Sequence, residues 1–191
     1  MKILVIGTGG REHALTWRLK QNGHELFAAS GNPATNYLQL AQDLKPDLTV
    51  VGPEAPLVAG VVDDFRSRNL KIVGPTKANA QLEASKTFSK RFMDQAGIPT
   101  ARSTQVDTIE DAQRALTTFE LPVVIKADGL AAGKGVIIAQ THQEAAQAVQ
   151  ALGPKLVIEE FLHGEEVSFI WRSDPRTGRA AGRARRGRTY R

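Results

Sequence analysis

The sequence predicts an α/β protein, in which a Rossmann-like N-terminal domain with a parallel sheet is followed by a partial α+β subdomain. Over residues 1–96, short β-branched runs alternate with helical patterns, which indicates a parallel sheet. At residues 97–100 (Gly-Ile-Pro-Thr) the helical pattern stops and a new unit begins, which indicates a domain boundary. In that unit, residues 122–139 contain two apolar runs around a glycine-rich loop, the pattern of a hairpin.

Composition limits the classes of protein to consider. The chain has 191 residues, 41% of them hydrophobic, which is enough for one large or two small cored domains. No apolar run approaches the roughly 18 residues of a membrane span, and no signal-peptide layout precedes the first strand, so we expect a cytoplasmic protein without a membrane partner. The absence of cysteine excludes disulfides and thiolate zinc sites, and the four histidines lack ligand spacing.

The basic character of the chain is confined to its last 20 residues. Residues 172–191 contain eight arginines and one aspartate, so this tail carries +7 while the rest of the chain carries −2. Such a tail is expected to be disordered. It is interpreted either as a nucleic-acid-binding appendage or as an unselected terminus, for example after a reading-frame change. The absence of lysine favours the second interpretation, so nucleic acid is not an expected partner.

The N-terminal domain is expected to alternate strands and helices. The expected strands are residues 2–6, 25–29, 47–51 and 71–73, and the expected helices are residues 14–22, 34–43 and 57–68. The first strand ends in Gly7-Thr8-Gly9-Gly10-Arg11-Glu12, so the following helix could receive an anion at its N-terminus. The third glycine of a dinucleotide fingerprint is missing, which leaves an anion site or a tight turn without ligand.

Glu54 follows the third strand between two prolines, Pro53 and Pro56. Open α/β sheets bind ligands at this edge, although Glu54 could equally be a favourable charge in the first turn of a helix. Residues 79–96 are expected to form two helices broken near Ser85, with an apolar stripe of Phe88, Phe92 and Met93 in the core and with solvated lysines.

The second unit is expected to contain helices at residues 109–119 and 143–152, the hairpin, and a strand at residues 156–161. In the hairpin loop, glycines at 129, 133 and 135 allow backbone N–H groups to approach a phosphate, and Lys126 and Lys134 add positive charge. An ordinary flexible hairpin is the alternative. Glu159 and Glu160 lie in an otherwise apolar strand and need partners, either a purine nucleoside or lysines such as Lys126.

Five motifs follow one another along the chain. They are residues 5–14 (VIGTGGREHA), 49–57 (TVVGPEAPL), 74–76 with 82–86 (GPT and LEASK), 124–136 (VIKADGLAAGKGV) and 157–166 (VIEEFLHGEE). In this order they resemble the ATP-grasp ligases, and within them the phosphoribosylamine-glycine ligase family of purine biosynthesis. The resemblance covers residues 1 to about 170 and is more specific than any single motif.

The resemblance implies a reaction and a set of site residues. ATP would phosphorylate glycine, and the amine of 5-phosphoribosylamine would attack the resulting glycyl phosphate to give an amide, ADP and phosphate. The residues implied in ATP binding are Lys90, Lys126, Gly129, Gly133, Lys134, Gly135, Glu159, Glu160, Leu162 and Glu166, with Lys126 and Lys134 in the catalytic role. Those implied in phosphoribosylamine binding are Gly9, Gly10, Arg11, Gly52, Pro53 and Glu54.

Departures from the family pattern qualify these expectations. Residues 32–47 and 151–155 are shorter than the family pattern, and the chain leaves it after Ile170. The family's magnesium ligands would lie beyond that point, so no metal ligand is expected in this chain and the chain alone is expected to be inactive or nearly so. We expect three parts, residues 1–96, 97–171 and the tail 172–191, in a monomer. The alternatives are a non-catalytic nucleotide-binding fragment and another ATP-grasp carboxylate-amine ligase.

Overall fold

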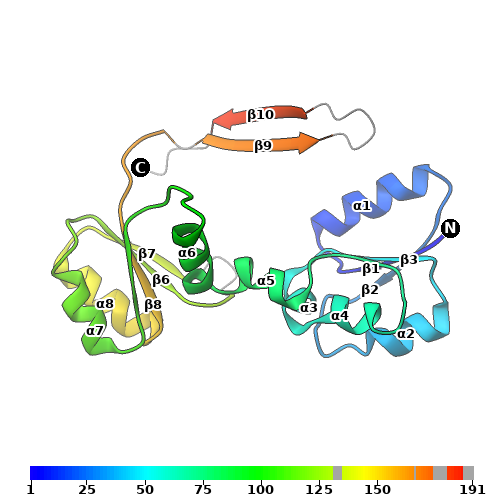
Figure 1. Cartoon of the computed structure of the whole chain (residues 1–191), viewed down its shortest axis with the longest axis horizontal. Coiled ribbons are helices and arrows are strands. Elements are labelled where there is room, and N and C mark those ends of the chain that lie inside the picture. The colour runs from blue at the N-terminus through cyan, green and yellow to red at the C-terminus, as the bar shows by residue number, and fades with distance from the viewer. Residues whose placement is uncertain (131–134, 166, 174–179, 187–191) are drawn as a thin grey trace. The chain divides into compact units, whose positions relative to one another are not determined.

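The computed structural model describes residues 1–130, 135–165, 167–173 and 180–186, and it divides into two compact units, residues 1–160 and 161–191 (Figure 1). The first unit contains two sheets, each with its own helices and its own hydrophobic core. Within the described residues, no helix is long and apolar enough to cross a membrane.

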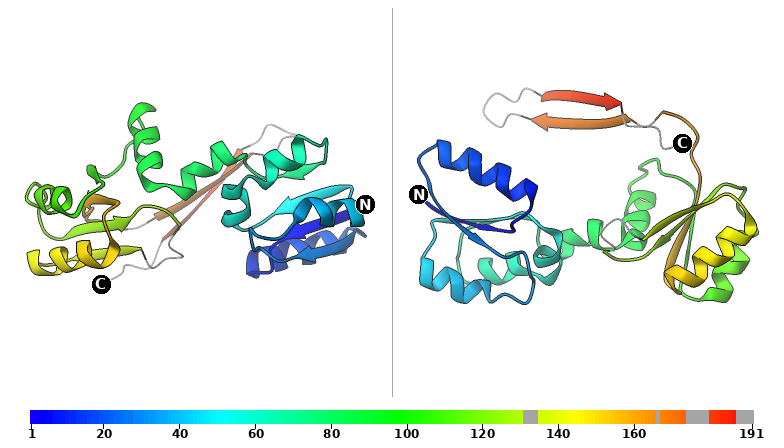
Figure 2. Two further views of the ribbon diagram at one scale, coloured as in Figure 1. Left: turned by 90° about the horizontal axis from the view of Figure 1, so that it is seen from below. Right: turned by 180° about the vertical axis from the view of Figure 1, so that it is seen from behind.

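The first sheet is the parallel sheet that the sequence predicts. Its strands are β1 (Lys2–Ile6), β2 (Glu25–Ala29), β3 (Leu48–Val51) and β4 (Ile72–Val73), in the order β2-β1-β3-β4. Helix α1 (Gly10–Gln21) covers one face, and α2 (Tyr37–Leu44) and α4 (Val61–Arg66) cover the other (Figures 1 and 2). Because β1 and β3 are parallel neighbours, the turns that follow them meet at one edge, where the Gly52 N–H donates to the Ile6 carbonyl at 3.0 Å.

The single helix predicted over residues 57–68 is wrong in detail. The structure has α3 (Glu54–Ala59) and α4, separated by Gly60 at φ 106°. Glycine adopts this left-handed backbone without the steric cost that a Cβ would bring, so it ends one helix and starts the next. The earlier start of α3 places Glu54 in its first turn, next to the carboxyl end of β3.

Two helices connect the sheets, and their break at Ser85 confirms the prediction. They are α5 (Lys77–Ala84) and α6 (Lys86–Gln95), and the Ser85 hydroxyl caps α6 by accepting the Phe88 N–H at 3.1 Å. The expectation about the faces of α6 is wrong, however. Phe88 and Phe92 are exposed, whereas Lys90 is the buried residue of the helix, because α6 turns its charged side toward the second sheet.

The second sheet is antiparallel and contains the predicted hairpin. Its strands are β5 (Ser103–Val106), β6 (Val123–Ala127), β7 (Val136–Ala139) and β8 (Leu156–Glu160), in the order β5-β8-β6-β7. Helices α7 (Ile109–Leu116) and α8 (His142–Leu152) pack on one face over a core of small and β-branched residues. Helix α6 reaches the sheet through β8. The expected domain boundary at residue 97 falls between α6 and β5, inside the first unit, and stays a prediction.

The second unit corrects the expectation of disorder for residues 172–173 and 180–186 of the tail, which lie in strands, while the other tail residues lie outside the described ones. Strands β9 (Val167–Ser173) and β10 (Ala180–Arg186) form an antiparallel ladder that pairs Val167 with Arg186 and Ser173 with Ala180. The prediction of disorder rested on the shortage of apolar side chains in residues 172–191. A two-stranded ladder is held by backbone hydrogen bonds, for which that composition is a poor guide.

Candidate active site

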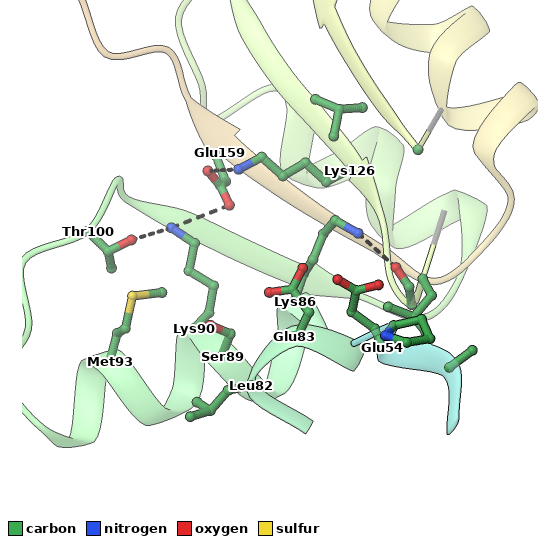
Figure 3. A pocket seen from close by; sticks show the side chains of 16 residues that line it. Glu54, Leu82, Glu83, Lys86, Ser89, Lys90, Met93, Thr100, Lys126 and Glu159 are labelled. Atoms are coloured by element: carbon green, nitrogen blue, oxygen red, sulfur yellow. Dashed lines mark hydrogen bonds and ion pairs between the residues drawn. The ribbon is translucent and has the colours of Figure 1, made fainter. Parts of the chain in front are cut away.

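The site lies in the first unit, in a pocket of about 730 Å³. This volume is typical of small-molecule and cofactor sites. Its walls come from α3, α5, α6, the hairpin β6–β7 and β8 (Figure 3). Its lining includes Pro53, Glu54, Glu83, Lys86, Lys90, Thr100, Lys126, Gly129, Gly135 and Glu159.

Two lysines share one buried glutamate in this pocket. The Lys126 Nζ lies 2.7 Å from one carboxylate oxygen of Glu159, and the Lys90 Nζ lies 3.4 Å from the other. Lys90 also donates to the Thr100 hydroxyl at 2.7 Å and to the Ala101 carbonyl at 2.9 Å. We call these three residues, Lys90, Lys126 and Glu159, the charge cluster; Figure 3 shows its members pointing toward one another.

Strand alternation explains why the cluster forms. Val123 and Ile125 point into the core under α7 and α8, so Lys126 lies on the opposite face of β6. Ile158 likewise points into the core, and Glu159 faces away from it. Because β6 and β8 are neighbours with Val124 opposite Glu159, Lys126 is a diagonal neighbour of Glu159 on this second face, which Lys90 reaches from α6.

Burial and net charge make the charge cluster chemically suited to an anion. Lys90 is 5% exposed and Glu159 is 6% exposed, and a charge so far from water must be paired. The Lys126 side chain is 28% exposed and lines the pocket. Two ammonium groups and one carboxylate leave a net charge of +1, and the reduced dielectric strengthens the attraction for an entering phosphate.

Asp128 connects the end of β6 to the start of α6. Its carboxylate accepts the Lys86 N–H at 2.7 Å and the Gly129 N–H at 3.0 Å, and the Ser85 hydroxyl donates to it at 3.1 Å. Burial raises the pKa of Asp128, but the hydrogen bonds from Thr87, Ser85, Lys86 and Gly129 outweigh that effect and hold the pKa below its usual value. The carboxylate is therefore charged at neutral pH and bound firmly to the helix end.

The N-terminal edge of the pocket contains a second ion pair. The Arg11 guanidinium donates to the Gly52 carbonyl at 2.8 Å and lies 3.1 Å from the Glu54 carboxylate. A hydrogen bond from its own backbone N–H, followed by the bond from Arg11, lowers the pKa of Glu54. Glu54 thus lies in the first turn of α3, as one of the two interpretations expected, and it also lines the pocket. That Glu54 binds a ligand stays a prediction.

Glu12 explains the glycine-rich turn after β1. This side chain is 6% exposed and accepts the Gly9 N–H at 2.8 Å. A Cβ at Gly7 would lie 2.6 Å from the Glu12 side chain, and a Cβ at Gly52 would overlap its carboxylate. The glycines of the turns after β1 and β3 thus make room for an internal carboxylate, that of Glu12, which stands in place of the third glycine of a dinucleotide fingerprint.

The structure brings together part of the predicted ATP site. Lys90, Lys126, Gly129, Gly135 and Glu159 line one pocket. Gly133, Lys134 and Glu166 lie outside the described residues. The remaining two predicted residues are not in the pocket lining: Glu160 accepts the Arg102 N–H at 2.6 Å on the sheet, and Leu162 is exposed in the second unit.

The predicted phosphoribosylamine residues follow the same pattern. Pro53 and Glu54 line the pocket, whereas Gly9, Gly10, Arg11 and Gly52 lie behind them at the turns after β1 and β3. Arg11 reaches forward from there to Glu54.

Sequence reasoning missed three residues of the site. The Lys86 Nζ donates to the Gly129 carbonyl at 2.9 Å, Asp128 holds the helix end, and Thr100 binds Lys90. Lys86 was expected to be solvated. Lys86 and Asp128 both lie within motifs of the sequence, but no local pattern indicates that they meet.

The described residues contain no group of three His, Cys, Asp or Glu side chains that could hold a metal ion. Glu54 and Glu83 line the pocket as separate carboxylates. The described part of the pocket therefore fits an anionic ligand through its lysines, and does not present a ready metal site.

Family models match nearly the whole chain. The N domain of phosphoribosylglycinamide synthetase matches residues 1–83, and the ATP-grasp (A) domain of phosphoribosylglycinamide synthetase matches residues 84–185. This chain belongs to the phosphoribosylglycinamide synthetase family. The two models meet at the last residue of α5, Ala84, next to the break at Ser85. The second match also continues past Ile170, where the sequence motifs were expected to end.

Comparison with individual proteins gives the same family. A phosphoribosylamine–glycine ligase from Escherichia coli O6:H1 is 49% identical over an alignment of 198 residues, which covers 89% of this chain and 46% of that protein. The crystal structure of phosphoribosylamine–glycine ligase from Thermotoga maritima has a TM-score of 0.70 at 30% identity, covering 88% of this chain and 46% of the other. The chain thus spans about half the length of the relatives it matches.

A more distant neighbour supports the fold alone. The ADP complex of N5-carboxyaminoimidazole ribonucleotide synthetase has a TM-score of 0.77 at 17% identity, with 99% of this chain and 54% of the other covered. The α/β and ATP-grasp fold class predicted from the motifs is therefore confirmed.

Proposed function

We propose that this chain carries the N domain and the nucleotide-binding residues of an ATP-dependent ligase that joins glycine to 5-phosphoribosylamine in cytoplasmic purine biosynthesis. Membership of the phosphoribosylglycinamide synthetase family and the names of its relatives support the reaction. The single observation that supports ATP binding is the charge cluster, which directs the Lys90 and Lys126 ammonium groups into a pocket of nucleotide size.

Different residues of the pocket would contact ATP and phosphoribosylamine in such a reaction. Lys90 and Lys126 would neutralise ATP phosphates and orient them toward the glycine carboxylate, since positioning and charge neutralisation supply most of the catalysis in phosphoryl transfer. Glu54 and Arg11 would contact phosphoribosylamine on the opposite side of the pocket. Magnesium would arrive with ATP and supply further neutralisation of its phosphates.

The proposal predicts saturable binding of magnesium-ATP to the purified chain. Calorimetric titration of Lys126→Ala should show an affinity about tenfold lower, which corresponds to ~1.4 kcal/mol for one charge-assisted phosphate contact. Lys20→Ala is the matched control, because Lys20 is an exposed lysine of α1 outside the pocket. A folded wild-type chain that binds no magnesium-ATP, or an equal loss in both variants, would contradict the proposal.

A further inference from the structure

Asp128 is a side chain for which the proposed reaction has no role, although it makes more hydrogen bonds than its position in a loop stem requires. Its carboxylate receives backbone N–H groups from Lys86, Thr87 and Gly129, at 2.7, 3.2 and 3.0 Å. The Ser85 hydroxyl donates to it at 3.1 Å and itself accepts the Phe88 N–H. One carboxylate therefore satisfies most of the free donors in the first turn of α6.

Further hydrogen bonds hold the segment around Asp128 to α6 and to the residues before β8. The Lys86 Nζ donates to the Gly129 carbonyl at 2.9 Å, the bond drawn from Lys86 in Figure 3. The Asp128 backbone N–H donates to the Lys155 carbonyl at 2.9 Å, just before β8. The end of β6, the start of α6 and the segment that enters β8 are thus tied at one point.

These three segments are the ones that carry the charge cluster. Lys126 precedes Asp128 by two residues on β6, Lys90 follows Lys86 by one helical turn on α6, and Glu159 lies on β8. The separation of the two ammonium groups therefore depends on how the start of α6 is held against the end of β6.

We propose that Asp128 is a positioning residue: by holding the N-terminus of α6 to the end of β6, it fixes the Lys90 ammonium group beside Lys126 and Glu159 at the spacing that a polyphosphate requires. Asp128 itself does not touch the ligand. Its carboxylate occupies the helix N-terminus, so that helix end is closed to a substrate anion, and the phosphates are left to the lysines. The part of this inference that concerns phosphates rests on the proposed function.

The chain provides a matched control for this inference. The carboxylate of Asp63 accepts the N–H of Lys77, the first residue of α5, at 2.7 Å, just as Asp128 accepts the N–H of the first residue of α6. Asp63 does not line the pocket. Asp63→Asn therefore weakens the start of α5, which carries no member of the charge cluster. Asp128→Asn weakens the start of α6, which carries Lys90.

The first measurement needs no ligand. Competitive acetylation with acetic anhydride, read by mass spectrometry, gives the reactivity of each lysine in the folded chain. Lys90 is 5% exposed and should react slowly in the wild type. Its rate relative to the other lysines should rise at least threefold in Asp128→Asn and stay unchanged in Asp63→Asn. An unchanged Lys90 rate in folded Asp128→Asn would overturn the inference, whether or not the chain binds ATP.

The second measurement separates positioning from general destabilisation. Calorimetry of Asp128→Asn should show an affinity for magnesium-ATP about tenfold lower, with an affinity for adenosine within twofold of the wild type. Equal losses for both ligands would mean that Asp128 only stabilises the fold. If Asp128→Asn does not fold, Ser85→Ala removes one partner of the same carboxylate. Its affinity for magnesium-ATP should then be about threefold lower, with the affinity for adenosine again within twofold of the wild type. A wild type that binds no magnesium-ATP contradicts the proposed function, and the acetylation result then decides the inference alone.

Discussion

The charge cluster and the Arg11–Glu54 pair were both expected to bind ligands, but they differ in burial. Lys90 and Glu159 are almost completely enclosed, whereas the side chains of Arg11 and Glu54 are 63% and 40% exposed. A buried cluster has a fixed geometry, because any rearrangement leaves a charge without water or partner. An exposed pair is weak and can exchange its partner for a ligand at little cost. The comparison indicates a preorganised side around the charge cluster, where we propose that ATP binds, and an adaptable side around Arg11 and Glu54, where we propose that phosphoribosylamine binds.

Removal of the shared carboxylate should give the largest effect. Glu159→Ala leaves two ammonium groups, one of them buried, without their counter-charge, and should destabilise the fold by about 3–5 kcal/mol. Urea unfolding monitored by circular dichroism measures this change. Glu160→Ala is the control on the same strand and should cost about 1 kcal/mol, since it loses one hydrogen bond to the Arg102 N–H. Similar losses in both variants would show that the cluster is not tightly coupled.

A methyl group at Gly52 should give the next largest effect. The new Cβ would overlap the buried Glu12 carboxylate, so Gly52→Ala should destabilise the chain by about 1–3 kcal/mol. Gly10→Ala is the matched control, because nothing lies within 4 Å of a Cβ at the first residue of α1, and it should change stability by less than about 0.5 kcal/mol. Thermal unfolding compares the two, and equal melting temperatures would refute the tight turn inferred here.

The stabilisation by Asp128 should depend on pH. Folding lowers the pKa of Asp128 from its ordinary value of 3.8, so the charged carboxylate stabilises the fold fully above that value. Asp128→Asn should lose about 1–2 kcal/mol at pH 7. The difference between variant and wild type should shrink as the pH falls below 3.8 and through the folded pKa. Urea midpoints at pH 7 and pH 3 test this, and a difference that grows on acidification would have the wrong sign.

The exposed pair should give the smallest effect on stability. Arg11→Ala should change the free energy of unfolding by no more than about 1 kcal/mol, because solvent screens the interaction with Glu54. If the substrate side binds a phosphoribosyl group, the same variant should bind ribose 5-phosphate several-fold more weakly, with the difference largest at low salt. A loss of more than about 2 kcal/mol in stability would place Arg11 with the buried cluster instead.

Most of the architecture could be predicted from periodicity. Strand β1 and the parallel sheet to which it belongs were predicted from β-branched runs that alternate with helical patterns. The break at Ser85 was predicted within the helical pattern of residues 79–96. The break at Gly60 was missed because the apolar spacing continues across it, and only the left-handed backbone of glycine separates the helices. Strand β10 was missed because it is paired through its backbone, and the composition of residues 180–186 does not predict that pairing.

The site was predicted in its components but not in its contacts. The motifs implied Lys90, Lys126 and Glu159, and one interpretation of Glu159 was a purine nucleoside as its partner, while in the structure both of its oxygens face lysines. The other interpretation left open, pairing with Lys126, is the one found here. Pairing of Asp128 with the start of α6 joins residues more than 40 positions apart, and no local pattern contains that information.

The role proposed for the charge cluster is tested by observing its two ammonium groups themselves. Nitrogen-15 correlation spectra of lysine side chains can follow the Nζ signals of Lys90, Lys126 and Lys20 while magnesium-ATP is added, with Lys90→Arg and Lys126→Arg used for assignment. The signals of Lys90 and Lys126 should both shift with one common saturation curve, while that of Lys20 should stay in place. Saturable binding of magnesium-ATP that shifts the signal of neither pocket lysine would contradict the proposal that the charge cluster receives the phosphates.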